Sequence, residues 1–408
     1  MKILFVHSNY PAQFRHLSAK LSSEGHEVLF LSQGKEWTAP KDNGVSMHRY
    51  ELGRDPTGEL CHPYLKRFES CVLTGQASLR AAMKLRQSGF EPDLIIGHSG
   101  FGSTLYLKEV WRQAKFLGYF EWFYRSSGSD VGFGENEPIS PDTACRVHTY
   151  NAPILMDLGA CDQAICPTQW QASQFPTHLR NNLNVIFDGI DTKIFCPLAE
   201  TEKQGELRIG DLSIPNDIPL VTYTTRGFEP YRGWPQVAQG LSLLMQRNPR
   251  VRVLLVGSDE VAYGAKRGDG KTWRQWALET FSFDPDRLHY LPPLQYSDYV
   301  KVLQHSWVHV YWTIPFILSW GLMESLACGC SVVASSTEPV REMIQPGQQG
   351  VLVDYFDSQG LADRVDELLQ NPQRRSQLSQ QAREFIINKG YTLDTCLAQQ
   401  LALVHSML

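Results

Sequence analysis

The sequence has no long hydrophobic run and no excess of positive charge, and each absence excludes a class of protein. The apolar stretch at the N-terminus, Ile3 to Val6, is too short for a signal peptide and is followed by no cleavage site. No stretch approaches the roughly 20 apolar residues of a membrane-spanning helix. The formal net charge is -5, whereas nucleic-acid-binding proteins usually carry a basic surface. We therefore expect a soluble, cytoplasmic protein that binds no nucleic acid, with peripheral membrane contact left open.

Paired cysteines are also missing. The nine cysteines are scattered, and Cys328 and Cys330 stand too close together for a metal motif and have no second pair. We expect reduced thiols that serve as small core residues. The sequence shows no cluster of metal-ligand residues, and Asp284-Pro285-Asp286 is typical of a turn. We predict no metal ion and no bound cofactor.

The sequence does contain enough apolar residues for two cores. Hydrophobic residues make up 42% of 408, and a chain of this length usually forms two domains of about 200 residues each. The first half alternates strand-like apolar runs with helical patterns, in which apolar residues recur every three or four positions. Its predicted strands are residues 3–6, 28–31, 93–96, 115–120, 163–166 and 184–187. Its predicted helices cover residues 14–21, 74–88 and 105–113, and residues 124–142 read as a long loop.

A polar stretch with several prolines interrupts this alternation at about residues 188–217, and the alternation then resumes. The second half has predicted strands at 220–225, 252–256, 308–311 and 331–334, and predicted helices at 235–247, 271–280, 297–305, 321–327, 358–370 and 374–408. We therefore predict an α/β protein with two doubly wound, Rossmann-like parallel-sheet domains that face a central cleft. The N-terminal domain would cover residues 1–195 and the C-terminal domain residues 196–390. A helix over 391–408 would return to the N-terminal domain.

The segment from Pro315 to Gly329 has the features of a nucleotide site. A strand ends before it, and a loop leads to a helix that should begin near Gly321, where a phosphate could approach the backbone. The start of this helix would offer unpaired N–H groups and a positive dipole end. Glu324, expected in the first turn, would accept hydrogen bonds from ribose hydroxyls, or else only stabilise the helix. The candidate binding residues are Ser319, Trp320, Gly321, Leu322 and Glu324.

A second candidate site follows the first predicted strand of the second half. Arg226 and Arg232 flank a turn there, and each adjoins a glycine, Gly227 or Gly233. A guanidinium matches the planar arrangement of phosphate oxygens. Solvated surface arginines are the alternative, but the position at the carboxyl end of a buried strand favours a role in binding a diphosphate.

These two segments resemble the signature regions of the retaining glycosyltransferases of family 4 (glycosyl transferases group 1), which have the GT-B fold. The run from Glu324 to Gly329, with Ser331 to Ala334 behind it, is similar to the second half of the family signature. The resemblance implies that Glu324 binds the nucleotide ribose and that Arg226 and Arg232 grip the donor diphosphate. It covers nearly all of the second half and is looser in the first.

The sequence also departs from the family pattern. The family's first signature Glu, which contacts the donor sugar, falls at Phe316, and Arg232 stands where the family has Lys. Gly257 resembles the glycine of the family's next strand turn, and Leu294 lies in the place where the family's loop cups the base. Asp188 takes the place of the usual Asn in the interdomain linker motif.

Two residues of the first half are candidates for contact with sugar or acceptor. His98 follows a predicted strand in a glycine-rich loop, and Glu121 interrupts an aromatic strand end. Either one could bind a hydroxyl or take part in catalysis, and either one could be a purely structural side chain. The loop from Asn9 to Gln13 lacks the glycine pair that the family often places beside the donor phosphate.

The sequence thus predicts a metal-independent, retaining hexosyltransferase of carbohydrate biosynthesis. It would move a sugar from a nucleotide-sugar donor, with UDP-sugar the first choice, to a hydroxyl acceptor such as a glycan, lipid-linked sugar, protein or small metabolite. The donor is a co-substrate, and Arg226, Arg232, Glu121 and His98 are the catalytic candidates. Two alternatives stay open: a nucleotide-sugar epimerase on the same fold, and a non-catalytic nucleotide-sugar-binding protein.

Overall fold

The computed structural model describes residues 1–33, 44–199 and 205–408. The chain divides into two compact units: unit 1 is Met1–Asp188 with Asp394–Leu408, and unit 2 is Gly189–Leu393. The chain passes from unit 1 to unit 2 after Asp188 and returns at Asp394. Backbone hydrogen bonds join these two segments: the N–H of Ile190 donates to the carbonyl of Tyr391 (2.9 Å), and the N–H of Leu393 donates to the carbonyl of Ile190 (2.8 Å). The sequence predicts boundaries after residues 195 and 390, and residues 200–204 of its predicted break lie outside the described residues.

Unit 1 is built on a seven-stranded parallel sheet with the order β3-β2-β1-β4-β5-β6-β7. Its strands are β1 (Lys2–Val6), β2 (Glu27–Ser32), β3 (Ser46–Arg49), β4 (Leu94–His98), β5 (Lys115–Tyr119), β6 (Gln163–Cys166) and β7 (Leu183–Val185). Ile3 to Val6 of β1 are all buried. Burial on both faces is typical of a central parallel strand.

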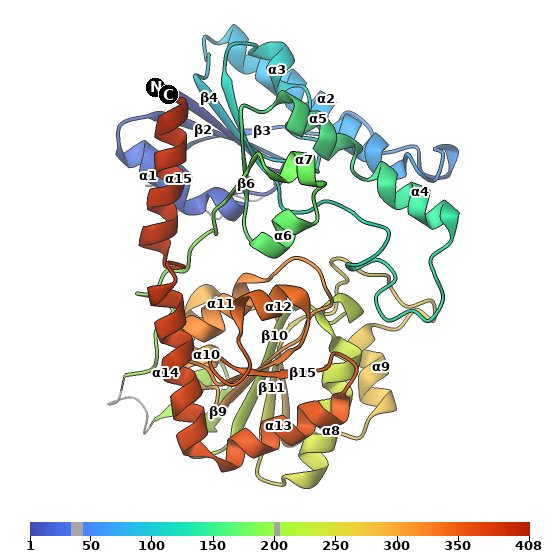
Figure 1. Ribbon diagram of the computed structural model, residues 1–408, viewed down its shortest axis with the longest axis vertical. Coiled ribbons are helices and arrows are strands. Elements are labelled where there is room, and N and C mark those ends of the chain that lie inside the picture. The colour runs from blue at the N-terminus through green and yellow to red at the C-terminus, as the bar shows by residue number, and fades with distance from the viewer. Residues whose placement is uncertain (34–43, 200–204) are drawn as a thin grey trace. The chain divides into compact units, whose positions relative to one another are not determined.

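Helices cover both faces of this sheet (Figure 1). They are α1 (Arg15–Ser23), α2 (Lys66–Gln87), α3 (Leu107–Val110), α4 (Pro141–Thr149), α5 (Ala152–Ala160), α6 (Gln169–Ser173), α7 (Thr177–Arg180) and α15 (Leu393–Met407). Because side chains alternate along a strand, Ile3 and Phe5 join a core with residues of α1 and α15, while Leu4 and Val6 join one with α2 and α3. The last helix of the chain therefore packs on the first strand.

Unit 2 repeats this plan with a six-stranded parallel sheet in the order β12-β11-β10-β13-β14-β15. Its strands are β10 (Leu220–Gly227), β11 (Arg252–Ser258), β12 (Leu288–Leu291), β13 (Val308–Tyr311), β14 (Val332–Ser335) and β15 (Val351–Val353). Its helices are α8 (Trp234–Arg247), α9 (Trp273–Thr280), α10 (Tyr296–His305), α11 (Trp320–Ala327), α12 (Glu338–Met343), α13 (Ser358–Gln370) and α14 (Pro372–Asn388). An antiparallel hairpin of β8 (Glu206–Ile209) and β9 (Leu212–Pro215) precedes the sheet.

The prediction of two doubly wound parallel-sheet domains is confirmed, with local corrections. The helix expected at residues 105–113 shrinks to the four residues of α3, and α2 begins eight residues before its predicted start. The β8–β9 hairpin lies inside the stretch interpreted as a linker. Its inward side chains, Leu207 and Ile214, are too few to give a strong alternating pattern, yet they are buried against β10 and β11.

Candidate functional site

Each sheet has one place where neighbouring strands are followed by connections that run in opposite directions, which is where doubly wound sheets bind ligands. In unit 2 this switch point lies between β10 and β13, and in unit 1 it lies between β1 and β4. The residues predicted from the sequence lie on β4, β10 and β11, on the loops after β5, β10, β12 and β13, and on α11.

Arg226 lies near the carboxyl end of β10, and its side chain is exposed. No hydrogen bond or ion pair holds its guanidinium within the described part of the chain, and only its carbonyl is fixed, by the Ser258 hydroxyl (2.9 Å). The next residue, Gly227, permits a close approach, since a Cβ there would lie 2.0 Å from the carbonyl oxygen of Glu260. The backbone around Arg226 is therefore fixed while its charge stays available.

Arg232 is different, because it is only 8% exposed. Its Nη1 donates to the Thr313 hydroxyl and to the Ile317 carbonyl, both at 3.2 Å, so it links the loop after β10 to the loop after β13. The Tyr263 ring centre lies 5.2 Å from the guanidinium. Burial acts to lower the pKa of Arg232, but neighbouring groups including Tyr311 raise it on balance. No carboxylate forms an ion pair with Arg232 among the described residues.

Glu324 is 5% exposed, and two tyrosine hydroxyls orient its carboxylate. Tyr296 donates to Oε1 (2.8 Å) and Tyr299 to Oε2 (3.0 Å). Burial and the carboxylate raise the pKa of Tyr299 well above its usual value, so this hydroxyl keeps its proton and acts as a donor. The prediction that Glu324 lies in the first helical turn is wrong, because α11 begins at Trp320 and has no acidic residue in its first turn.

The start of α11 also differs from the expectation of unpaired N–H groups. The Ser319 side chain accepts from the N–H of Gly321 (3.2 Å), and the Ser319 carbonyl accepts from the N–H of Leu322 (3.2 Å). The Leu322 side chain is fully buried and belongs to the core, whereas Trp320 is 37% exposed. A Cβ at Gly321 would meet only ordinary contacts, the nearest being the Tyr299 hydroxyl at 3.4 Å.

The remaining predicted residues of unit 2 have internal packing roles. A Cβ at Gly257 would lie 2.5 Å from the Thr225 carbonyl oxygen, so glycine lets β11 approach β10 closely. The Gly257 carbonyl accepts from the Tyr290 hydroxyl (2.9 Å). Leu294 is half-buried against the core that includes the β8–β9 hairpin.

Sequence reasoning missed several residues that shape this site. Tyr263, Thr313 and Ile317 contact Arg232, and Tyr296 and Tyr299 hold Glu324. These residues carry no motif of their own. The available signal was the high content of tyrosine close to strand ends, which by itself does not distinguish a site from a core.

The unit 1 switch point gathers His7, His98 and Glu121. His98 is 2% exposed; its Nδ1 lies 2.8 Å from the Ser99 carbonyl, and its Nε2 lies 3.5 Å from Oε2 of Glu121. Because a carbonyl only accepts hydrogen bonds, Nδ1 carries the hydrogen, and Nε2 is left facing the carboxylate. The other carboxylate oxygen accepts from Gln13 Nε2 at 3.3 Å. The structure thus brings His98 and Glu121 together.

His7, which the sequence analysis did not name, packs edge-on against His98 with 4.8 Å between ring centres. The N–H of Asn9 donates to His7 Nδ1 (2.8 Å), so the ring hydrogen of His7 lies on Nε2. Burial, with the neighbouring His98, lowers the pKa of His7 to about 3, and the ring stays neutral. The buried Asp157 lies close by and accepts from the hydroxyls of Ser99 and Thr104, both at 2.7 Å.

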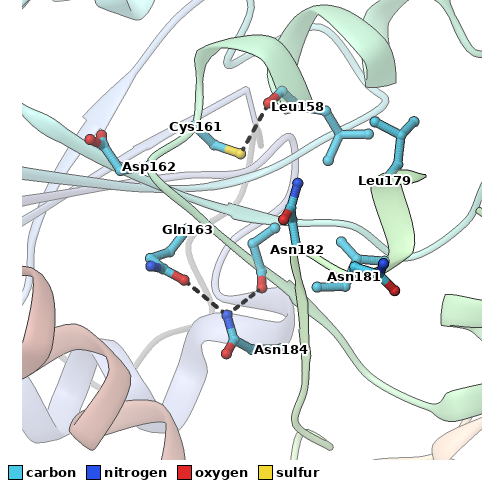
Figure 2. Close-up of a pocket in the computed structure, with 10 residues that line it drawn as sticks. Leu158, Cys161, Asp162, Gln163, Leu179, Asn181, Asn182 and Asn184 are labelled. Atoms are coloured by element: carbon cyan, nitrogen blue, oxygen red, sulfur yellow. Dashed lines mark hydrogen bonds between the residues drawn. The ribbon is translucent and has the colours of Figure 1, made fainter. Parts of the chain in front are cut away.

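A separate pocket of about 370 Å³ opens in unit 1 beside the starts of β6 and β7, at the sheet edge opposite the histidines (Figure 2). Asn181, Asn182 and Asn184 contribute amides to its lining, and Asn184 donates to Oε1 of Gln163 (3.0 Å). None of the predicted site residues lines this pocket.

Within the described residues, one group of side chains has metal-ligand chemistry: Glu24, His26 and His405, whose ligand atoms lie within 4.8 Å of one another in the turn after α1 and on α15. Two of the three are exposed, and all lie away from both switch points. Asp284 is paired with Arg287 (2.6 Å) in a turn, as its sequence context suggests.

Comparison with known proteins identifies the family. The family described as Glycosyl transferase family 4 group matches residues 24–195, and Glycosyl transferases group 1 matches residues 210–385. The chain therefore belongs to the group 1, family 4 glycosyltransferases, and its two Rossmann-like units have the GT-B fold, as the sequence predicts.

Among curated proteins, the chain is similar to enzymes named D-inositol 3-phosphate glycosyltransferase. The protein of Corynebacterium aurimucosum is 25% identical over 206 residues, which is 50% of this chain and 46% of the relative. The protein of Mycolicibacterium smegmatis is 26% identical over 244 residues, or 58% of this chain and 52% of the relative. The chain thus spans about half the length of the curated relatives that it matches.

Solved structures support the fold over the whole chain. Sucrose-phosphate synthase from Thermosynechococcus elongatus has a TM-score of 0.68 at 19% identity, covering 100% of this chain and 99% of the other. HepE of Anabaena in complex with UDP-glucose has a TM-score of 0.71 at 16% identity, covering 100% of both chains. Among the described residues, no helix combines the length and apolar character that crossing a membrane requires.

Proposed function

We propose that this chain transfers a sugar from a nucleotide diphosphate to a hydroxyl acceptor, with unit 2 holding the donor. The observation that carries this proposal is the buried guanidinium of Arg232, which has hydrogen bonds to neutral oxygens but no carboxylate partner among the described residues. Glu229 helps to raise the pKa of Arg232 from beyond ion-pair distance, but no carboxylate contacts this guanidinium, and burying a charge without a partner in contact is costly. A diphosphate would supply that contact, and the exposed Arg226 at the end of β10 would supply a second cation.

The buried carboxylate of Glu324 suits the ribose of the same nucleotide. Two tyrosine hydroxyls already fix its orientation, so the carboxylate would lose little freedom on accepting sugar hydroxyls. This role matches the one that the family resemblance implies.

The chemistry follows from charge stabilisation. The bond from the anomeric carbon to the diphosphate oxygen breaks, the acceptor oxygen bonds to that carbon, and the acceptor proton passes to the leaving diphosphate. Arg226 and Arg232 would stabilise the negative charge that develops on the leaving group, so no metal is required. In this front-face displacement the configuration at the sugar carbon is retained.

We infer a uridine nucleotide and a hexose as the donor. HepE, which shares the fold, was solved with UDP-glucose. The acceptor would meet unit 1, where His98 and Glu121 can bind a hydroxyl. The cysteines of the described chain are all free, which suits a reducing compartment such as the cytoplasm.

A second candidate is a protein that binds the nucleotide sugar without turning it over. Phe316 favours it, because this residue occupies the family's donor-sugar Glu position and is 4% exposed, packed against the rings of Tyr231 and Tyr263. Such a protein would bind nucleotide and never release it from a sugar donor.

The test begins with thermal shift of the wild type against UDP, GDP, ADP and dTDP, followed by hydrolysis and transfer assays on sugars of the best nucleotide. The matched variant is Arg232→Met, which keeps a long, unbranched side chain and removes the buried charge. We expect its melting temperature without ligand to be unchanged or higher, and its nucleotide shift to vanish. A wild type that no nucleoside diphosphate stabilises would contradict the proposal. Binding without turnover would select the second candidate.

A further inference from the structure

Glu229 lies between the two arginines in sequence, and its carboxylate is completely buried. It makes no ion pair among the described residues, although its charge helps to raise the pKa of Arg232. Instead it accepts backbone hydrogen bonds from three consecutive residues: Gly264 at 2.7 Å, Tyr263 at 3.1 Å and Ala262 at 3.3 Å. A carboxylate that receives several N–H groups is a strong, directional anchor.

This anchor fixes the segment that follows β11 onto the loop that follows β10. Gly264 fits closely, since a Cβ there would lie 3.2 Å from Oε2 of Glu229. The Ser258 hydroxyl adds a second attachment, donating to the Arg226 carbonyl and accepting from the N–H of Glu260 (3.2 Å). The segment from Ser258 to Gly264 is therefore held at both ends against the arginine loop.

Tyr263 is the middle one of the three residues that donate to Glu229, and its ring contacts Arg232. The ring centre lies 5.2 Å from the guanidinium carbon. Phe316 packs edge-on against Tyr263 at 5.2 Å, and Tyr231 stacks with it at 6.4 Å. Tyr263 is still 39% exposed, so the ring contacts the buried cation and also reaches solvent.

We propose that Glu229 is a positioning residue of the donor site. Its carboxylate holds Tyr263 over Arg232, and the ring in turn fixes the plane of the guanidinium for a diphosphate. This inference rests on the proposed function, since it assumes that Arg232 binds the phosphates of a nucleotide.

The chemistry of the anchor explains why a carboxylate is needed. A carboxylate only accepts hydrogen bonds, and both oxygens of Glu229 are used. In Glu229→Gln one oxygen becomes an NH2 group, which would face backbone N–H groups that also donate. The anchored segment should then move, and Tyr263 should leave the guanidinium.

The experiment is a double-mutant cycle of Glu229→Gln and Tyr263→Ala, read out as the dissociation constant of whichever of UDP, GDP, ADP and dTDP binds wild type most tightly. We expect each single variant to weaken binding about ten-fold, as the loss of a desolvated cation–π contact would. The double variant should be no weaker than the worse single variant, because both changes remove one contact. The affinity for the matching nucleoside monophosphate should change less than two-fold.

Two controls separate positioning from stability. Tyr263→Phe keeps the ring and removes only the hydroxyl, which also acts on Arg232, so it should weaken binding clearly less than Tyr263→Ala. Asp357→Asn changes another carboxylate of unit 2 that accepts a backbone N–H, from Gly360 at 2.7 Å; it should lower the melting temperature without changing nucleotide affinity. Hydrogen exchange of residues 259–264 should accelerate in Glu229→Gln only.

The outcomes are distinct. Additive losses in the cycle, or a Tyr263→Ala variant with wild-type affinity, would overturn the positioning role while leaving the proposed function intact. If Glu229→Gln does not fold, the contrast between Tyr263→Ala and Tyr263→Phe decides the matter. A wild type that binds none of the four nucleotides would overturn the proposed function itself, and the exchange of residues 259–264 would then still report whether Glu229 anchors the segment.

Discussion

The two units place loops at the same topological position but fill them with different chemistry. At the end of β10 and just after it, unit 2 has two arginines that form no ion pair with a carboxylate among the described residues. At the ends of β1, β4 and β5, unit 1 has two histidines and a glutamate, and His98 contacts both of the others. The first arrangement suits an anion, and the second suits hydroxyl groups and protons.

This difference shows that the sheet provides the place and the side chains provide the function. Both switch points arise from the same strand order, and both lie at carboxyl ends of buried strands. Variants in the two units should therefore differ, with charge deciding the effect in unit 2 and hydroxyl binding deciding it in unit 1.

The largest expected effect comes from Arg226→Ala in unit 2. Its guanidinium is exposed and unpartnered within the described residues, so the melting temperature should stay within about 1 °C of wild type. Turnover of the nucleotide sugar should fall about 100-fold, because the variant lacks one group that stabilises the negative charge developing on the leaving diphosphate. Steady-state kinetics and differential scanning fluorimetry measure the two effects. Arg250→Ala, another exposed arginine before β11, should change neither, and near-normal turnover in Arg226→Ala would contradict the anion site.

Acid should affect the two units unequally. Burial lowers the pKa of both His7 and His309 to about 3, so each histidine binds fewer protons in the folded state than in the unfolded state. The free energy of unfolding therefore falls as the pH drops below about 6.5, where the unfolded histidines take up protons. Burial raises the pKa of Asp157 to about 6, so between about pH 4 and 6 it binds more protons when folded, and acidification favours the folded state. In unit 1 these effects oppose each other.

We therefore expect hydrogen-exchange protection of β10 and β13 to fall by up to about ten-fold per pH unit between pH 6 and 4.5. Protection of β1 and β4 should fall less. Asp157→Asn should remove the offset and make unit 1 equally sensitive to acid, whereas identical acid profiles of the two units in wild type would contradict this reasoning.

A smaller effect is expected from Glu121→Gln in unit 1. The amide keeps the size of the side chain but loses the charge that faces His98, so kcat/KM should fall about five-fold, the range of one hydrogen bond. Nucleotide affinity should be unchanged, because unit 2 holds the donor. Acceptor-saturation kinetics measure this. Glu91→Gln, which alters an exposed ion pair with Arg86 ahead of β4, serves as the control. A loss of nucleotide affinity in Glu121→Gln would contradict the assignment of donor binding to unit 2.

The smallest effect concerns backbone strain in the unit 1 loop. Ala12 has a φ of 45°, whereas unit 2 uses Gly233, with a φ of 66°, in the turn before α8. Ala12→Gly should therefore stabilise the protein by about 0.5 kcal/mol, the relief of strain less the added freedom of the unfolded chain. The reverse change, Gly233→Ala, should destabilise, since a Cβ there would lie 2.3 Å from Trp312. Urea denaturation compares the two variants.

Much of the fold was predictable because buried parallel strands are continuous apolar runs. β6 and α13 have their predicted limits, and β1, β2, β10 and β11 differ by a few residues. The short α3 and the β8–β9 hairpin were not predictable, because their packing partners lie far away in sequence. The roles of the predicted site residues remain predictions.

The sequence by itself determined the family, the two doubly wound domains, the positions of Arg226 and Arg232 at a strand end and that of Glu324 in a helix, because periodicity and short motifs are local properties. Only the tertiary structure decided that Arg232 is buried while Arg226 is exposed, that Tyr296 and Tyr299 hold Glu324, and that His7 joins His98 and Glu121. The burial of a side chain and its hydrogen-bond partners depend on which distant segments pack together. Burial in turn sets how much free energy an unpaired charge costs, and so how strongly it interacts with an opposite charge.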